Sequence, residues 1–252
     1  MRDIIESIKN KLSEIEEKED VRIIMAVESG SRAWGFASPD SDYDVRFIYV
    51  RKQEEYLRLM PVRDVIEWQL DDVYDISGWD LKKALQLLHD SNPTLHEWCN
   101  SPIVYKENEL AEPFRELTRQ FFLPKKAMFH YLSMAEHATR QYLMGEEVRI
   151  KKYFYALRPI LAARWVAENR TAPPMMFDEL VEAQLPQKLA PVVEDLLEAK
   201  KQVSELGISS RIPELDAFIE EQLEELKVKA QQEENRKNSW DALEEFFRSA
   251  LG

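Results

Sequence analysis

Residues 27–50 read VESGSRAWGFASPDSDYDVRFIYV, and this stretch decides the fold. The apolar run 21–27 before it predicts a strand that ends at Ser29-Gly30-Ser31. Glycine lets the backbone turn sharply, and Ser31 then falls where a short helix would begin. Its hydroxyl and the free backbone N–H groups of that helix can point at an anion such as a phosphate. The stretch therefore predicts a strand, a phosphate-binding bend and a second strand.

The second strand carries two carboxylates at its start. Residues two apart in a strand lie on one face, so Asp42, Asp44 and Arg46 are expected on one side. Tyr43, Val45 and Phe47 are then expected to point into a core. Two neighbouring carboxylates repel each other, and Mg²⁺ relieves this by binding one or two carboxylates together with phosphate oxygens. A Gly-Ser bend facing an Asp-x-Asp pair predicts a site for a nucleoside triphosphate.

The string ESGSRAWG followed by DSDYDVRFIY resembles the signature of the polymerase-β-like nucleotidyltransferase superfamily, and in its extended form the RlaP/YcgL-type branch associated with RNA repair. The resemblance implies an enzyme that moves a nucleoside monophosphate from a triphosphate to an acceptor hydroxyl and releases pyrophosphate. It implies two Mg²⁺ ions, or Mn²⁺ in their place, held by Asp42, Asp44 and a third carboxylate. Gly30 and Ser31 would hold the β- and γ-phosphates. Arg32 and Arg46 would either contact phosphate or neutralise the aspartates.

In the superfamily the third carboxylate lies on a later strand beside the Asp-x-Asp strand. Asp71 and Asp72 are typical of a turn between two strands, and Asp80 fits the first turn of a helix expected after Gly78. Asp75, between Tyr74 and Ile76, falls inside an expected strand, where a solvated charge would be out of place. We therefore favour Asp75 as catalytic residue and metal ligand, with Asp80 as the alternative. The role of Glu28, which ends the first apolar strand, stays open between an ion pair with Arg32 and a place facing the metal.

Length and composition limit the class of protein. The chain has 252 residues, 44% of them hydrophobic, and a formal net charge of −13. This charge argues against a general nucleic-acid-coating surface, because such binding depends on Lys and Arg. The sequence contains no P-loop motif, its single Cys99 excludes an internal disulfide, and no apolar run approaches the roughly 18 residues of a membrane span. We expect a cytoplasmic protein without a membrane partner, of unknown oligomeric state.

The helical and strand patterns predict an α+β fold. We expect a nucleotidyltransferase-type mixed sheet flanked by helices in residues 1–105 and an all-helical domain in 106–252 that completes the nucleotide and acceptor cleft. Apolar periodicity predicts helices at about 1–19, 107–121, 124–144, 148–169, 190–206, 213–234 and 237–251.

A second unusual string, KKYFYALRP, spans residues 151–159 in the helical half and also resembles the RlaP/YcgL family. On a helix, residues 151, 155 and 158 share one side, as do 152, 155 and 159. Lys151, Lys152 and Arg158 could hold a triphosphate, and Tyr155 could stack on a base. The alternative is a buried helix whose cations pair with local carboxylates.

The sequence is compatible with two functions. The first is the nucleotidyltransferase, with an RNA end, a protein hydroxyl or a small molecule as acceptor. The second is a nucleotide-binding regulatory or antitoxin-like module that acts through a protein partner. The intact Asp42 and Asp44 favour the enzyme.

Overall fold

The computed structural model describes residues 2–38, 40–145, 147–202 and 208–252. By its internal contacts the chain divides into two compact units: the first holds residues 1–33, 42–121 and 237–252, and the second holds 34–41 and 122–236. This division differs from the expected boundary at residue 105, because residues 111–120 and 241–251 pack into the core of the first unit. The number of independently folding domains stays a prediction.

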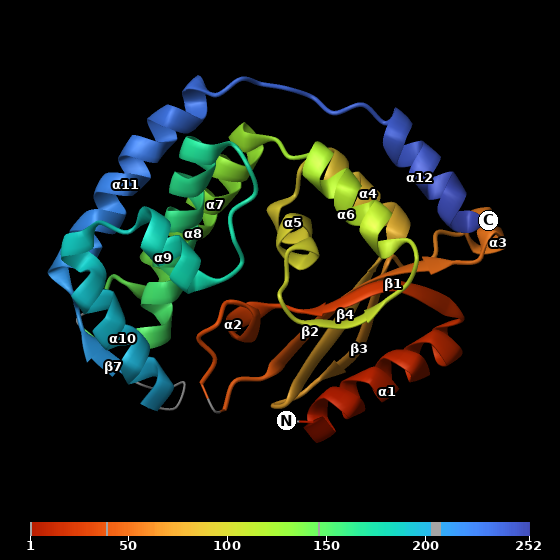
Figure 1. Cartoon of the computed structure of the whole chain (residues 1–252), viewed down its shortest axis with the longest axis horizontal. Helices are drawn as coiled ribbons and strands as arrows, with labels where there is room; N and C mark the ends of the chain where they lie inside the picture. The colour runs from red at the N-terminus through yellow and green to blue at the C-terminus, as the bar shows by residue number, and fades with distance from the viewer. Residues whose placement is uncertain (1, 39, 146, 203–207) are drawn as a thin grey trace. The chain divides into compact units, whose positions relative to one another are not determined.

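The first unit is built on a five-stranded mixed sheet with the strand order β3-β4-β2-β1-β5 (Figure 1). The central pair, β2 and β4, is parallel, whereas the other neighbouring pairs are antiparallel. In the parallel pair, Asp44 lies opposite Asp75 and Tyr49 opposite Asp80. The strands are β1 (Val21–Glu28), β2 (Tyr43–Arg51), β3 (Val65–Leu70), β4 (Tyr74–Asp80) and β5 (Val104–Glu107).

Helices cover both faces of this sheet (Figure 1). On one face, α1 (Arg2–Glu19) buries Ile8, Leu12 and Ile15 against the sheet. The other face is covered by α4 (Leu81–His89), α5 (Pro93–Cys99) and α6 (Ala111–Gln120), and α12 (Asp241–Leu251) packs into the same core. Two four-residue helices, α2 (Gly30–Ala33) and α3 (Gln53–Tyr56), follow β1 and β2.

The second unit is mainly helical. Its core surrounds α8 (Ile150–Asn169), of which the residues from Ala156 to Ala163 are all buried. Along the described ranges, no helix is both long and apolar enough to cross a lipid bilayer. The other elements are α7 (Pro124–Tyr142), β6 (Glu147–Arg149), α9 (Phe177–Gln184), the 3₁₀ helix η1 (Gln187–Leu189), α10 (Ala190–Gln202), β7 (Ile208–Ser210) and α11 (Pro213–Gln232).

The expected fold class is confirmed, with local differences. The helical half also contains a two-stranded ladder between β6 and β7, which no periodic pattern indicated. The helix expected from Trp79 begins instead at Leu81, because β4 continues through Gly78. A Cβ at Gly78 would lie 2.2 Å from the Phe47 ring, so this glycine permits close strand packing rather than a turn. Residues 203–206 of the helix expected at 190–206 lie outside the described ranges.

Candidate active site

The bend after β1 lies directly against the aspartate of β2. Gly30 has φ +60°, in the left-handed region, and begins α2. The Ser29 amide donates to the Asp44 carbonyl at 2.8 Å, which holds the bend beside β2. A Cβ at Gly30 would come to 2.0 Å from Asp44 Oδ2, so the carboxylate occupies space that only glycine leaves. The predicted approach of the Gly-Ser bend to the Asp-x-Asp strand is therefore present in the fold.

Asp44 and Asp75 share one guanidinium. Arg46 donates from Nη2 to Asp44 Oδ1 at 2.9 Å and to Asp75 Oδ2 at 2.6 Å. Its Nη1 donates to the Asp75 carbonyl at 2.7 Å. The parallel register of β2 and β4 brings the two carboxylates together, and the alternation within β2 puts Arg46 on the same side as Asp44. Two carboxylates from neighbouring strands thus lie close enough to bind a single cationic group.

The other aspartates considered as the third carboxylate serve local structure. Asp80, at the far end of β4, accepts from the Lys82 amide at 2.8 Å and so caps the N-terminus of α4. Its other oxygen accepts from the Tyr56 hydroxyl at 2.9 Å. Asp71 Oδ1 accepts from the amides of Val73 and Tyr74 in the turn between β3 and β4. Of the aspartates considered, the geometry favours Asp75 as the partner of Asp44, and its catalytic role stays a prediction.

Asp42 and Arg32 shape the entry into β2. Asp42 comes one residue before the strand, and its carbonyl accepts from Arg32 Nε at 2.8 Å. The Arg32 guanidinium carbon lies 3.8 Å from the centre of the Tyr43 ring. These contacts tie α2 to the start of β2. The predicted contacts of Arg32 and Ser31 with phosphate, and of Asp42 with metal, stay predictions.

Glu28 is a buried acid directly next to Asp44. Its Oε1 accepts from the Asp44 amide at 2.9 Å, and its Oε2 accepts from the Tyr105 hydroxyl. The side chain is fully buried, and this burial raises the pKa of Glu28 to about 7. The hydrogen bonds of Glu28 thus go to Asp44 and Tyr105, and a role beside a metal ion stays an open alternative. Tyr105 is a residue that sequence reasoning missed. The only signal for Tyr105 would have been the pairing of β5 with β1, which the sequence does not reveal.

The second unit holds the residues expected from the string 151–159. The Lys152 ammonium lies 3.7 Å from the Tyr142 ring centre and 4.6 Å from that of Tyr155. Arg158 is only 2% exposed, and its guanidinium carbon lies 4.5 Å from the Trp34 ring centre. The sequence left open whether Arg158 faces a ligand or lies in a buried helix. Because α8 is buried around most of its circumference, this arginine packs in the core.

Of these four residues, the structure brings Lys152 and Tyr155 into contact, with Tyr155 37% exposed at the surface. Lys151 is half-buried in the first turn of α8. The contacts of Lys151, Lys152 and Tyr155 with a nucleotide stay predictions.

A comparison with protein families matches residues 4–249 to the model of the RlaP family, described as an RNA repair pathway DNA polymerase beta family. The chain belongs to the RlaP family. The match covers both units, so the resemblance found in residues 27–50 extends through the helical half.

Two further similarities accompany this match. The uncharacterized protein YcgL of Bacillus subtilis is 47% identical over 227 residues, which cover 89% of this chain and 87% of the relative. A crystal structure of a nucleotidyltransferase-like protein from Exiguobacterium sibiricum aligns over 96% of this chain and 79% of its own, with 13% identity. Its TM-score of 0.30 is too low to support an argument from shared structure.

The acidic side chains near the bend of this RlaP-family chain are of the chemical type that binds magnesium. Asp44 and Asp75 present hard carboxylate oxygens at one place, and the Arg46 guanidinium already binds both of them. Across the part of the chain that the structure describes, no three His, Cys, Asp or Glu side chains form a ready metal-binding group. A magnesium ion that takes two carboxylates and completes its shell with phosphate oxygens and water suits this arrangement.

Proposed function

We propose that this protein is a Mg²⁺-dependent nucleotidyltransferase that moves a nucleoside monophosphate from a nucleoside triphosphate to an acceptor hydroxyl and releases pyrophosphate. The observation that supports it is the meeting of the Gly30 bend, Asp44 and Asp75 in a member of the RlaP family. Phosphoryl and nucleotidyl transfers depend mainly on positioning and on electrostatic stabilisation, and these groups supply both.

Each group near the bend has a proposed task. Asp44 and Asp75, with Asp42, would hold magnesium, which when bound supplies positive charge to the phosphate oxygens and the leaving pyrophosphate. Ser31 and the N–H groups at the start of α2 bind the β- and γ-phosphates. Asp75 also orients the acceptor hydroxyl and accepts its proton.

Arg46 and Glu28 support the aspartates from two sides. In the absence of a metal ion, Arg46 neutralises Asp44 and Asp75 together. When a metal ion neutralises these carboxylates instead, the Arg46 guanidinium can turn to phosphate oxygens. Glu28 holds the Asp44 amide from within the core, so it fixes the strand from which the Asp44 side chain projects. Glu28 is thus a positioning residue.

The second unit contributes contacts to the nucleotide in this proposal. Tyr155 stacks on the base, and Lys151 and Lys152 bind phosphate oxygens. Arg158 is buried, so its contribution is to hold Trp34, whose ring meets that of Tyr155 edge-on at a centroid distance of 6.4 Å.

Pyrophosphate release from each of the four nucleoside triphosphates tests the proposal, with Mg²⁺ and with Mn²⁺. Asp44→Asn and Asp75→Asn should each lower the rate about 100-fold or more, because each removes a charge that acts in the transition state. Asp72→Asn is the matched control, since Asp72 is exposed in the neighbouring turn. Equal rates in wild type and Asp44→Asn, or no turnover of any triphosphate, would contradict the proposed reaction.

The acceptor needs a separate experiment. We favour an RNA end, because the description of the family names an RNA repair pathway. The net charge of −13 restricts the binding of RNA to a local surface of the protein. A triphosphate labelled on its α-phosphate should transfer label to an RNA 3′-hydroxyl rather than to protein or to a small molecule. A stoichiometric protein partner recovered without any turnover would instead favour the regulatory or antitoxin-like module.

A further inference from the structure

The chain between the Gly30 bend and the Asp-x-Asp strand packs in the second unit. It leaves the first unit after Ala33 and returns to it at Asp42, and residues 34–41, the connecting segment, belong to the second unit. The Gly30 bend and Asp42 are both proposed to act at the candidate active site. They are therefore the two ends of one connection whose middle is held by other parts of the chain.

Phe36 fixes the connecting segment in the core of the second unit. Its side chain is 2% exposed, and its ring centre lies 4.9 Å from that of Phe154 and 5.3 Å from that of Phe177. Aromatic pairs at such distances stabilise a core beyond the area that they bury. Two residues earlier, the Trp34 carbonyl accepts from the Phe177 amide at 2.9 Å. The side chain and the backbone of the segment are thus both tied to the start of α9.

A buried lysine on α10 binds the same point. Lys200 is 7% exposed, and its ammonium donates to the Phe36 carbonyl at 2.8 Å and lies 5.0 Å from the centre of the Phe36 ring. Lysine is seldom buried, because the ammonium loses its hydration unless polar contacts compensate. The two residues are 164 positions apart in the sequence. Phe36 and Lys200 together form the anchor of the connecting segment.

A closed turn leads from this anchor to Asp42. Ser38 and Ser41 are both buried, and the Ser41 amide donates to the Ser38 carbonyl at 3.1 Å. The Ser38 amide donates back to the Ser41 hydroxyl at 3.0 Å, so the turn has little freedom. Asp42 follows at once, and its carbonyl accepts from Arg32 Nε of α2 at 2.8 Å. A shift of Phe36 would therefore move Asp42 and α2 together.

We propose that Lys200 and Phe36 are positioning residues that set the place of Asp42 through the connecting segment. Neither side chain contacts substrate or metal. Lys200 holds Phe36, and the closed turn passes this position on to Asp42. The catalytic consequence rests on the proposed nucleotidyltransferase function. Since a misplacement of about 1 Å can cost about 100-fold in rate, such distant residues matter for catalysis.

Amide hydrogen exchange, measured by NMR on the metal-free full chain, tests the positioning itself. Lys200→Met keeps the aliphatic stem but removes the ammonium, so the Phe36 carbonyl loses this bond. The amides of Ser29, Ser41 and Asp44 are hydrogen-bonded in the turn and at the two ends of the connection. They should exchange about tenfold faster or more than in wild type, because the anchor no longer restrains them. This measurement requires no enzymatic activity.

Pyrophosphate release tests the consequence for catalysis. Lys200→Met should lower kcat and raise the Mg²⁺ concentration of half-maximal rate about tenfold, because Asp42 is misplaced. A variant that only loses stability would reduce the amount of active enzyme and leave the Mg²⁺ dependence unchanged. Ser41→Ala removes the hydroxyl that closes the turn and should act in the same direction. The test therefore does not depend on the folding of one variant.

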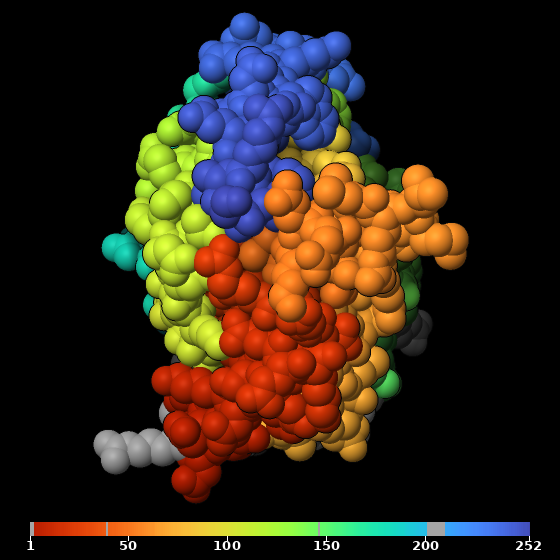
Figure 2. All heavy atoms as spheres, turned by 90° about the vertical axis from the view of Figure 1, so that its right-hand side faces the viewer, coloured from red at the N-terminus to blue at the C-terminus, as the bar shows by residue number. Residues whose placement is uncertain are grey.

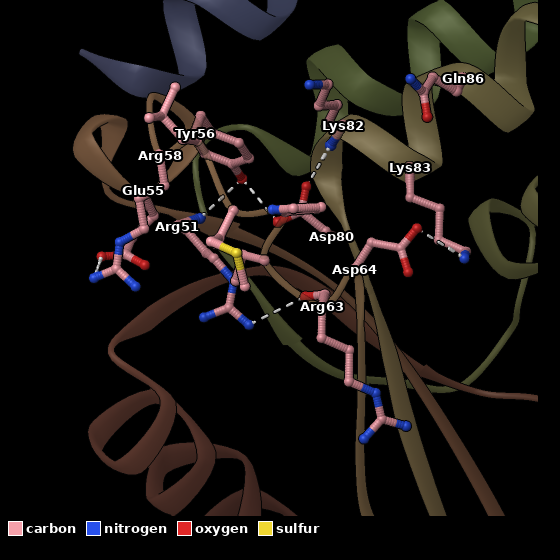
Figure 3. Close-up of a pocket in the computed structure, with 14 residues that line it drawn as sticks. Arg51, Glu55, Tyr56, Arg58, Arg63, Asp64, Asp80, Lys82, Lys83 and Gln86 are labelled. Atoms are coloured by element: carbon pink, nitrogen blue, oxygen red, sulfur yellow. Dashed lines mark hydrogen bonds and ion pairs between the residues drawn. The ribbon is translucent and has the colours of Figure 1, made fainter.

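Arg51→Met is the matched control. Arg51 also donates to backbone carbonyls, those of Glu19 and Arg63. Its guanidinium carbon lies 5.2 Å from the centre of the Tyr49 ring, which resembles the place of Lys200 on Phe36. Figure 3 shows Arg51 beside a pocket at the end of β2, with its bond to Arg63 dashed.

This end of β2 is remote from the candidate active site. Asp44 and Arg51 are seven residues apart along the strand, which corresponds to about 23 Å when it is extended. Figure 2 shows the outer side of the region, where the orange segment that contains α3 meets the blue helix α12. Arg51→Met should therefore keep the wild-type Mg²⁺ dependence and the wild-type exchange at Ser29 and Asp44.

Two outcomes would overturn the proposal. Unchanged amide exchange in both Lys200→Met and Ser41→Ala would show that the anchor does not hold Asp42. Equal shifts of the Mg²⁺ dependence in Lys200→Met and Arg51→Met would indicate a general loss of stability instead of positioning. If the wild-type protein turned over no triphosphate, the proposed function would fail, and faster exchange at Ser29 and Asp44 in Lys200→Met would still support the positioning.

Discussion

The carboxylate of Asp44 lies in the space that a side chain at Gly30 would fill. A Cβ built on Gly30 comes to 2.0 Å from Asp44 Oδ2 and to 2.9 Å from Asp44 Cγ. Residue 30 has φ +60°, so its backbone conformation also favours glycine. The two residues are 14 positions apart, yet each restricts what the other position can hold.

Gly30→Ala should therefore reduce activity far more than stability. The left-handed backbone costs alanine about 1–2 kcal/mol, and the displaced Asp44 carboxylate should lower pyrophosphate release about 100-fold. Gly35→Ala is a matched control, because Gly35 also has a positive φ, +86°, but its Cβ would meet only the flexible end of Met176. Denaturant unfolding and the activity assay measure the two effects. Similar activity losses in both variants would contradict the importance of the contact with Asp44.

Asp75→Ala should lower turnover at little cost in stability, whereas Asp80→Ala should lower stability and leave turnover intact. Asp80 caps α4 and binds Tyr56, so its removal should cost about 0.5–2 kcal/mol of stability and leave the turnover of folded enzyme intact. Asp75 contacts Arg46 in a partly exposed site, so its removal should abolish turnover at little cost in stability. Unfolding curves and turnover of both variants decide the matter, and a fully active Asp75→Ala enzyme would exclude Asp75 as the third carboxylate.

Arg46→Gln should increase the stabilisation that Mg²⁺ gives the protein. Without the guanidinium, Asp44 and Asp75 repel each other, and a divalent cation no longer competes with Arg46 for them. We expect Mg²⁺ alone to raise the melting temperature of the variant by about 2–4 °C more than that of wild type, which corresponds to about 1 kcal/mol.

Arg22→Gln serves as the control for this experiment, since Arg22 pairs with Glu109 at the surface at 2.7 Å. If Mg²⁺ shifted the melting temperatures of wild type and Arg46→Gln equally, the two carboxylates would not be the place where it binds.

Glu28 should make the folded state less stable as the pH rises from about 4.5 to 7. The pKa of Glu28 is raised by burial from 4.5 to about 7, so the folded protein keeps a proton that the unfolded chain has released. Stability from this group is complete below pH 4.5 and declines up to pH 7, by about 3 kcal/mol in total. Glu28→Gln keeps a hydrogen-bonding group without the charge, so its stability should fall less across this interval.

Urea unfolding at several pH values between 4.5 and 8 measures this difference. Glu6→Gln, on the exposed side of α1, removes a surface carboxyl and should retain the wild-type slope. Parallel curves for wild type and Glu28→Gln would mean that Glu28 does not hold a proton in the folded state.

Local patterns were enough to predict the framework of the candidate site. The run 21–27, the glycine bend and the strand from Tyr43 follow from hydrophobicity and turn chemistry, which act between residues close in sequence. Strand alternation correctly put Arg46 on the side of Asp44, because residues two apart on a strand share a face. The same alternation correctly put Val45 and Phe47 into the core.

Contacts between distant segments could not be predicted in this way. Burial of Arg158 depends on how Trp34 and Met175 pack around α8, and a helical repeat cannot show which sides of a helix its neighbours cover. The ladder of β6 and β7 joins segments about 60 residues apart, each only three residues long and too short to show a period.

The amino-acid sequence by itself determined the strand, bend and strand of residues 21–51, the family, and the presence of carboxylates beside a glycine turn. The tertiary structure decided between Asp75, which the sequence favoured, and Asp80 as the neighbour of Asp44, and it alone showed that Tyr105 binds Glu28. The physical reason is that the first set depends on interactions within a few residues. The second depends on the register of β2 with β4 and of β1 with β5, which only the packing of the whole sheet sets.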